Sequence, residues 1–237
     1  MANFLKAEWK NLIMANYVID PGMLKKYLPY KTEIDTYDGN VFVSLVGFLF
    51  SETSMLGLRI PFHINFEEVN LRFYVRYNHD GNWKRGVVFI KEIVPKPAIT
   101  FVANTLYREQ YCTMPMKHFT IETEDVFKIK YQWKYKSRWN SLEAVTEKLA
   151  VPIPENSEAH FITEHYWGYS KYSDKKTFEY EVRHDPWNVY PIKEYSVDCD
   201  FASLYGDQFS LLTGSVPNSI FVAQGSEVAI LNKRNIV

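Results

Sequence analysis

Acidic, amide and basic side chains recur at every second position between Glu68 and Tyr77. The polar positions are Glu68, Asn70, Arg72, Tyr74 and Arg76, and they alternate with the apolar or aromatic residues Val69, Leu71, Phe73, Val75 and Tyr77. Successive side chains of a β-strand point to opposite faces, so the pattern predicts a strand with one polar face and one packed face. The polar face either meets water outside the fold or lines a wet cavity inside it.

An internal polar face would bring together groups that can bind and protonate a ligand. Glu68 and Arg72 then lie on the same side of the strand, about 13 Å apart along its axis. Arg72 can hold a ligand carboxylate in a bidentate pair, while Glu68 accepts or delivers a proton elsewhere on the ligand. A carboxyl in an aromatic interior has a raised pKa, whereas one in water titrates near about 4.3. Alternatively, each residue finds a cross-strand partner and both are structural.

Motifs for metal, cofactor or nucleophilic chemistry are weak in this chain. His160 and His165 are five residues apart, which does not place two imidazoles on one helical face, so we predict no metal site. No Gly-rich phosphate loop, Gly-x-Ser-x-Gly elbow or paired-cysteine motif is present, so we predict no cofactor. Cys112 and Cys199 are expected to be reduced thiols, with Cys112 a small buried side chain rather than a nucleophile.

The elements that must position these residues are predicted to be mostly strands. Aromatic residues make up 16% of the chain, and they favour β structure. We expect strands at residues 32–36, 41–50, 68–77, 86–94, 127–136, 166–172, 177–184, 192–198 and 220–231. Short helices are expected from Pro21 to before Pro29, from near Pro97 to Arg108, and from Ser157. Many antiparallel strands with few helices predict a barrel or pseudobarrel that encloses an interior.

The segment 127–136 shows the most regular alternation. Five residues, Phe127, Ile129, Tyr131, Trp133 and Tyr135, alternate with four lysines and Gln132. Because rings and charges point in opposite directions, the pattern favours a solvated lysine face over a buried aromatic face, rather than a site for an acidic partner.

Length and charge predict one domain, residues 1–237, and exclude some partners. Barrels of this size commonly form one unit. The 27 basic and 28 acidic residues nearly cancel, without the positive field typical of proteins that bind nucleic acid or anionic lipid. The start of the chain lacks a signal-peptide pattern, and no apolar run reaches membrane-spanning length. We therefore expect a cytoplasmic protein with no nucleic-acid or membrane partner, and the sequence predicts no oligomeric state.

Two segments resemble the acetoacetate decarboxylase superfamily. Residues 107–117, Tyr-Arg-Glu-Gln-Tyr-Cys-Thr-Met-Pro-Met-Lys, follow a predicted helix and are similar to that superfamily's Gly-Arg-Glu and Pro-Lys-Lys, whose first lysine forms a Schiff base with a β-keto acid. Residues 66–69, Phe-Glu-Glu-Val, look like its Tyr-x-Glu-Val, which supplies a cavity carboxylate. The resemblance implies that Glu68 points into a cavity, with Asn70, Arg72 and Tyr74 on the same face.

The continuation is closer to a YqjF-like branch of the superfamily. Residues 68–75 are similar to its Glu-x-Asn-x-Arg-x-Tyr-Val, and residues 184–187 to its late His-x-Pro-Trp. Where the branch often has Glu-Arg-Tyr, this chain has His165 between Glu164 and Tyr166. The resemblance implies a cone-shaped antiparallel barrel, and it adds Tyr111 and His184 to the ligand-binding candidates.

Met116 occupies the position of the Schiff-base lysine. The resemblance therefore implies a fold and a cavity without the covalent chemistry. Since neighbouring side chains of an extended segment face opposite ways, Lys117 is expected at the surface. Met116 is expected to form a soft, apolar part of the cavity wall and is a further ligand-binding candidate.

Two functions are compatible with these residues. The first is binding of a small anionic organic molecule in a central cavity, by Asn70, Arg72, Tyr74, Tyr111, Met116 and His184. The alternative is a lyase or hydrolase of small oxo compounds that uses Glu68 as its acid or base. A filled barrel without a cavity would support neither function.

Overall fold

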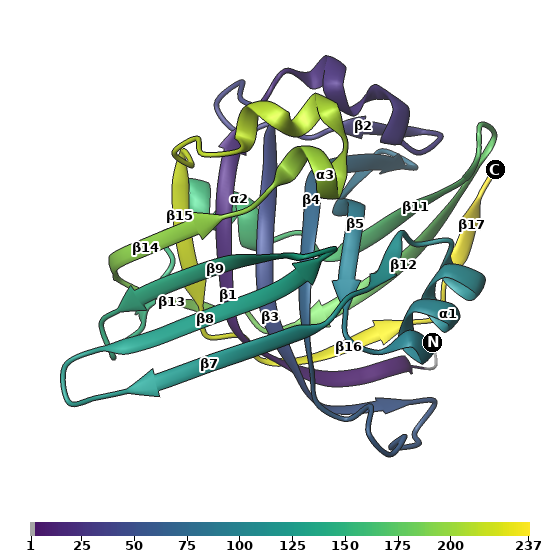
Figure 1. The fold of residues 1–237 in the computed structure, drawn as a ribbon. Helices are drawn as coiled ribbons and strands as arrows, with labels where there is room; N and C mark the ends of the chain where they lie inside the picture. The colour runs from purple at the N-terminus through teal and green to yellow at the C-terminus, as the bar shows by residue number, and fades with distance from the viewer. Residues whose placement is uncertain (1–2) are drawn as a thin grey trace.

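A closed ring of seven strands forms the body of the protein in a computed structural model, which describes residues 3–237 (Figure 1). Around the ring, the strands are β1 (Asn3–Val18), β3 (Phe42–Met55), β4 (Phe66–His79), β5 (Asn82–Val94), β11 (Trp167–Ser173), β12 (Lys176–His184) and β16 (Glu227–Leu231). Strand β3 pairs with both β1 and β4, which closes the ring. Only β5 and β11 pair in parallel within it. The predicted antiparallel barrel is thereby confirmed.

Six shorter strands extend the ring, and four others form a second sheet. The extensions are β2 (Thr32–Ile34), β6 (Tyr111–Thr113), β10 (Val151–Pro152), β13 (Asn188–Tyr190), β15 (Ser219–Ala223) and β17 (Arg234–Ile236). The second sheet has the order β14 (Ile192–Asp198), β9 (Arg138–Thr146), β8 (Phe127–Tyr135) and β7 (Met116–Glu122). In Figure 1 this second sheet lies across the strands of the ring.

Within residues 3–237, five short helices connect the strands. They are η1 (Pro21–Tyr27), α1 (Pro97–Tyr107), α2 (Glu158–Thr163), α3 (Phe201–Tyr205) and η2 (Asp207–Leu212), of which η1 and η2 are 3-10 helices. The three predicted helices are present: Asp20 caps η1, Ser157 caps α2, and α1 ends at Arg108 with a left-handed φ of 58°. His165 lies just beyond the end of α2. No helix among residues 3–237 combines the length and apolar character needed to cross a membrane.

The second sheet packs its aromatic face against the outside of the ring. Ile129, Tyr131 and Trp133 of β8 are fully buried, whereas Lys128 and Lys130 form ion pairs with Glu143 at 2.5 and 2.7 Å. This arrangement confirms the predicted solvated lysine face. A Cβ atom at Gly47 of β3 would come within 2.8 Å of the Tyr131 ring, so the close approach of the two sheets requires glycine there.

The two faces of β4 serve different interiors. The odd-numbered residues Val69, Leu71, Phe73 and Val75 belong to the hydrophobic core between the ring and the second sheet. Glu68, Asn70 and Arg72 point the other way and are nevertheless buried, with exposed fractions of 2%, 1% and 8%. The polar face therefore lies inside the barrel. Alternation of residue types could not show whether the polar face of β4 lies inside the barrel or in solvent. The apolar face is buried under the second sheet, on the outside of the ring, which leaves the polar face to point inward.

The prediction of a single strand at residues 220–231 is wrong, because the structure has two strands there, β15 and β16. Strand β15 pairs with residues 12–16 of β1, and β16 pairs with residues 3–8 of the same strand. The chain turns between them at Gly225, which has a φ of 85°. A Cβ atom there would lie 1.9 Å from the Trp9 carbonyl oxygen, so the turn needs glycine.

Candidate functional site

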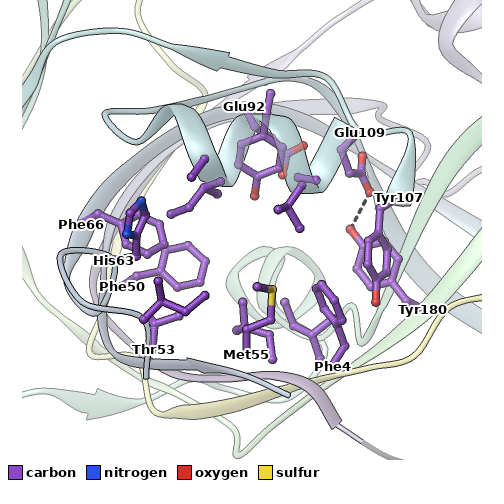
Figure 2. Close-up of a pocket in the computed structure, with 18 residues that line it drawn as sticks. Phe4, Phe50, Thr53, Met55, His63, Phe66, Glu92, Tyr107, Glu109 and Tyr180 are labelled. Carbon is purple, nitrogen blue, oxygen red and sulfur yellow. Dashed lines mark hydrogen bonds between the residues drawn. The ribbon is translucent and has the colours of Figure 1, made fainter. Parts of the chain in front are cut away.

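Two adjoining cavities lie at the centre and at one end of the barrel. The inner cavity has a volume of about 60 Å³, and all seven ring strands contribute to its wall. The outer cavity, of about 150 Å³, lies between the end of the ring and helix α1, and its wall is mostly aliphatic and aromatic (Figure 2). Phe50, Glu92, Tyr111, Tyr180 and Ile230 line both cavities. The site is therefore a polar chamber next to an apolar one.

Glu68 is buried in the wall of the inner cavity. Its two carboxyl oxygens accept hydrogen bonds from the Asn70 amide and the Tyr111 hydroxyl, both at 2.9 Å. Burial raises the pKa of Glu68 to about 7, although both hydrogen bonds and the charge of Arg72 lower it. At neutral pH this carboxyl can both give and take a proton.

Two further buried carboxyls, Glu92 and Glu109, lie beside Glu68. Burial raises the pKa of Glu109 to about 8, with a further contribution from the charge of Glu68, even though the Tyr180 hydroxyl donates to it at 2.8 Å (Figure 2). Burial also raises the pKa of Glu92 well above its usual range, and the charges of Glu109 and Glu68 add to this shift. Sequence reasoning missed both residues. The signal for Glu92 was a carboxylate between the apolar residues at the end of β5, next to Lys91.

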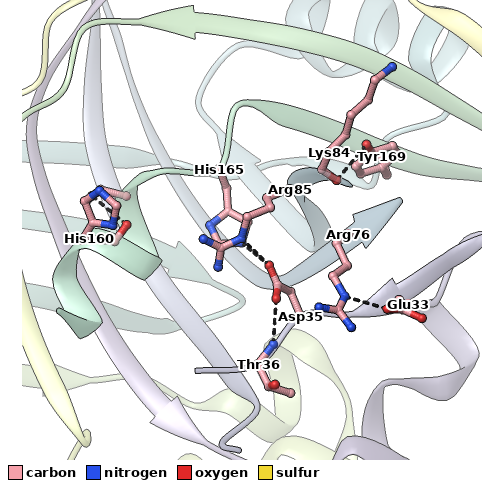
Figure 3. Close-up of polar contacts among 10 residues, drawn as sticks. Glu33, Asp35, Thr36, Arg76, Lys84, Arg85, His160, His165 and Tyr169 are labelled. Carbon is pink, nitrogen blue, oxygen red and sulfur yellow. Dashed lines mark hydrogen bonds and ion pairs between the residues drawn. The ribbon is translucent and has the colours of Figure 1, made fainter. Parts of the chain in front are cut away.

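Arg72 is buried in the inner cavity wall and forms no ion pair within residues 3–237. Its guanidinium has one polar contact, from Nη2 to the Met14 sulfur at 3.9 Å, and its Nε has no partner among residues 3–237. The next arginine on this face, Arg76, pairs with Glu33 at 2.6 Å near the surface (Figure 3). A buried charge without a partner is costly, so the inner cavity is suited to an anion that pairs with Arg72.

The structure brings most of the predicted site residues together. Glu68, Asn70, Arg72, Tyr111 and His184 all line the inner cavity. His184 stacks on Trp187 with ring centroids 4.2 Å apart, and burial lowers its pKa. Tyr74 and Met116 line neither cavity: the Tyr74 hydroxyl shares a hydrogen bond with Ser44 at 2.7 Å, and Met116 packs against the core between the two sheets.

Lys117 lies outside both cavities, on the exposed strand β7. Its Nζ sits over the Trp139 ring, 4.5 Å from the ring centroid. A keto acid bound in either cavity would lie away from the Lys117 amine. We therefore expect no acetoacetate adduct after borohydride treatment, as measured by intact-mass analysis. A stable adduct that maps to Lys117, and that is absent from Lys117→Arg, would contradict this expectation.

A second polar cluster is formed by Asp35, Arg85 and His165 (Figure 3). The buried carboxylate of Asp35 accepts from Arg85 Nε at 2.6 Å and contacts His165 Nε2 at 3.2 Å. His165 lines the inner cavity. Sequence reasoning missed this pair, because Asp35 and His165 are 130 residues apart and Asp35 lies in no recognisable motif. No group of three or more His, Cys, Asp or Glu residues within 3–237 is arranged to hold a metal ion.

Comparisons with known proteins agree on the family and the fold. The model of DUF2071, a family described as an uncharacterized conserved protein, matches residues 6–227. The uncharacterized protein YqjF of Bacillus subtilis (strain 168) is 25% identical over 187 residues, which cover 77% of this chain and 74% of YqjF.

Among solved structures, acetoacetate decarboxylase from Legionella pneumophila superposes with a TM-score of 0.65 at 13% identity, covering 100% of this chain and 88% of that one. The enduracididine biosynthesis enzyme MppR, in complex with pyruvate, gives a TM-score of 0.66 at 10% identity, covering 99% and 91%. At these identities the likeness shows the fold alone, which is that of the acetoacetate decarboxylase-like proteins.

Proposed function

The chain belongs to the DUF2071 family, and we propose that it binds a small organic carboxylate inside its acetoacetate decarboxylase-like barrel, with Arg72 as the cation that pairs with the ligand. The observation that carries this proposal is the buried guanidinium of Arg72, which forms no ion pair within residues 3–237. A carboxylate matches the planar donor geometry of arginine and can form two parallel hydrogen bonds with it.

The other charges of the cavity also favour an anionic ligand. Burial raises the pKa of Glu109 to about 8 and that of Glu92 well above its usual range, so burial favours the protonated form of both carboxyls. A protonated carboxyl donates a hydrogen bond and leaves the positive charge of Arg72 uncancelled. MppR, which has the same fold, holds pyruvate in its solved complex. This supports a ligand in the size range of small organic acids.

The outer cavity suits the apolar part of such a ligand. Ile99, Val102 and Ala103 of α1 face it, and its wall joins that of the inner cavity at Glu92, Tyr111 and Tyr180. A carboxylate at Arg72 could thus carry a short aliphatic chain that passes these three residues.

We expect binding to strengthen with chain length in a series of linear 2-oxo acids, starting from pyruvate. Each methylene that enters the outer cavity should contribute about 0.8 kcal/mol, or roughly fourfold in Kd by isothermal titration calorimetry. Ala103→Leu, which narrows the outer cavity, should weaken the longest acids while pyruvate binds as before. An affinity that is independent of chain length would contradict this placement, and no binding by any member would contradict the proposed function.

A second candidate function is acid-base catalysis on small oxo compounds through Glu68. The observation that favours it is the pKa of Glu68, which burial raises to about 7. General acids and bases are most effective when their pKa lies near the working pH. Such an enzyme would be a lyase or hydrolase without a covalent lysine, because Met116 replaces the lysine of the decarboxylase pattern.

We propose a single domain over residues 1–237 that works in the cytoplasm with a small-molecule ligand. The near balance of 27 basic and 28 acidic residues supports the proposal that nucleic acid is not a partner.

A further inference from the structure

Asp35 holds His165 in a fixed position at the wall of the inner cavity. One Asp35 oxygen, Oδ2, lies 2.6 Å from Arg85 Nε and 3.2 Å from His165 Nε2, and the other accepts from the Thr36 backbone N–H at 3.0 Å. Burial raises the pKa of Asp35, but the hydrogen bonds and charges of His165 and Arg85 prevail and lower it to about 2. Asp35 is therefore an ionised carboxylate that can only accept hydrogen bonds.

The ionised state of Asp35 determines where the imidazole carries its proton. His165 must donate from Nε2, so the neutral ring has its free electron pair on Nδ1. That Nδ1 is buried and has no partner among residues 3–237. Leaving a buried acceptor without a partner is costly. The ring of His165 shares the inner cavity wall with Arg72, so a ligand held by Arg72 would lie beside the imidazole.

The surroundings of His165 keep its ring neutral. Burial lowers the pKa of His165 to about 4, and the charges of Arg85 and Arg72 lower it further, against the opposing effect of Asp35. The rings of Tyr74 and Phe161 pack against it with centroids 4.8 and 5.0 Å away. A ligand carboxylate that pairs with Arg72 would cancel part of the repulsion, which makes His165 more basic when the cavity is filled.

We propose that His165, oriented by Asp35, is a catalytic base that removes a proton next to the carbonyl of a 2-oxo acid, whose carboxylate is held by Arg72. The proposal rests on the carboxylate site described above. In the step, the C–H bond breaks and its proton passes to His165 Nδ1, while its electron pair forms the C=C bond of an enol. The carbonyl oxygen takes the proton of the neutral Glu68 carboxyl. Asp35 is a positioning residue, which also stabilises the imidazolium that forms.

Exchange of the pyruvate methyl hydrogens in D2O tests this step directly. Reversal of the step from a deuterated base places deuterium on the methyl carbon, so the methyl signal in proton NMR decays faster with the wild-type protein than in buffer. His165→Gln can still donate to Asp35 but has no basic nitrogen, and it should slow the catalysed exchange by about 100-fold or more. His118→Gln is the matched control. His118 lies on the exposed strand β7, and its Nδ1 is 2.8 Å from a carboxyl oxygen of Glu67, which makes a similar histidine–carboxylate pair outside the cavities. It should exchange at the wild-type rate.

The pH profile of the exchange separates a base from a structural histidine. The rate should rise as His165 loses its proton, from about pH 4 upward, and fall as Glu68 ionises near about pH 7. Asp35→Asn should weaken the catalysed exchange and shift the rising limb. If His165→Gln fails to fold, pH titration of the wild-type His165 Nδ1 signal by ¹⁵N NMR replaces it. The midpoint of this titration should move to higher pH when pyruvate is added, and an unchanged midpoint would contradict the proposed contact with the ligand.

Binding measured in the same samples distinguishes the two ways in which the proposal can fail. If pyruvate binds with an Arg72-dependent affinity but no exchange exceeds that of buffer, the base is wrong and the carboxylate site stands. If neither binding nor exchange occurs, both are wrong. Catalysed exchange that persists in a folded His165→Gln variant would assign the base to another residue and overturn the inference.

Discussion

Replacing Arg72 with methionine should abolish the binding of small carboxylates without destabilising the ligand-free protein. Methionine keeps most of the volume of the arginine side chain but removes a buried charge that forms no ion pair within residues 3–237. The loss of a desolvated, hydrogen-bonded ion pair to the ligand should weaken Kd by at least about 100-fold. Because an unpaired buried charge is itself costly, Tm of the empty protein should stay the same or rise by about 2–4 °C per kcal/mol gained. Calorimetric titration with pyruvate and thermal melts measure both effects.

Arg76→Met provides the matched control for this substitution. Arg76 lies four residues further along β4, near the surface, and its side chain pairs with Glu33 at 2.6 Å. Exposed ion pairs contribute about 0–1 kcal/mol, so this variant should bind pyruvate as the wild type does. An Arg72→Met variant that keeps its affinity for carboxylates, or an equal loss of affinity in both variants, would contradict the proposed pairing of Arg72 with the ligand.

The thermal stability of the wild-type protein should fall as the pH rises from about 5 to about 8.5. Burial raises the pKa of Glu68 to about 7 and that of Glu109 to about 8. At these two carboxyls the folded protein therefore binds more protons than the unfolded chain, which outweighs the opposite effect of His165, whose pKa burial lowers to about 4. The stabilisation that these two carboxyls contribute is fully present below their unfolded pKa of about 4.3. It is lost as the pH rises through their pKa values in the folded protein. The total loss should be on the order of a few kcal/mol, measured by melts at a series of pH values.

Glu109→Gln should flatten this pH dependence, since an amide keeps the shape of a protonated carboxyl and cannot ionise. At pH 8.5 the variant should melt above the wild type. Glu143→Gln is the control, because the hydrogen bonds and charges of Lys128 and Lys130 lower the pKa of Glu143. Its carboxylate is ionised throughout the range, so the slope should not change. A wild-type melting temperature that is flat or rising between pH 5 and 8.5 would mean that these carboxyls are not held neutral.

Several elements of the fold follow from local patterns in the sequence. The alternation in residues 127–136 predicts both the strand and the face that is buried, and the caps at Asp20 and Ser157 mark the starts of two helices. The polar face of β4 is also evident from alternation alone. Its location inside the barrel is not, because that depends on the closure of β3 onto β1 and on the cover provided by the second sheet.

The contents of the site depend on contacts between distant segments, which local patterns do not contain. Asp35 meets His165 across 130 residues, and Tyr180 meets Glu109 across 71. Tyr74 has the right parity to face the inner cavity, but its ring packs against Phe161 and its hydroxyl bonds to Ser44. Parity along a strand selects a face, whereas packing decides which residues on that face reach a cavity.

The guanidinium of Arg72 reports most directly on the central claim, that an organic carboxylate binds in the inner cavity. In protein labelled with ¹⁵N-arginine, the Nε–H signal that disappears in Arg72→Met identifies this residue, and that of Arg76 serves as an internal reference. On titration with pyruvate, we predict that the Arg72 signal shifts and saturates with the Kd measured by calorimetry, while the Arg76 signal stays in place. An Arg72 signal that does not move, or shifts confined to exposed arginines, would contradict the claim.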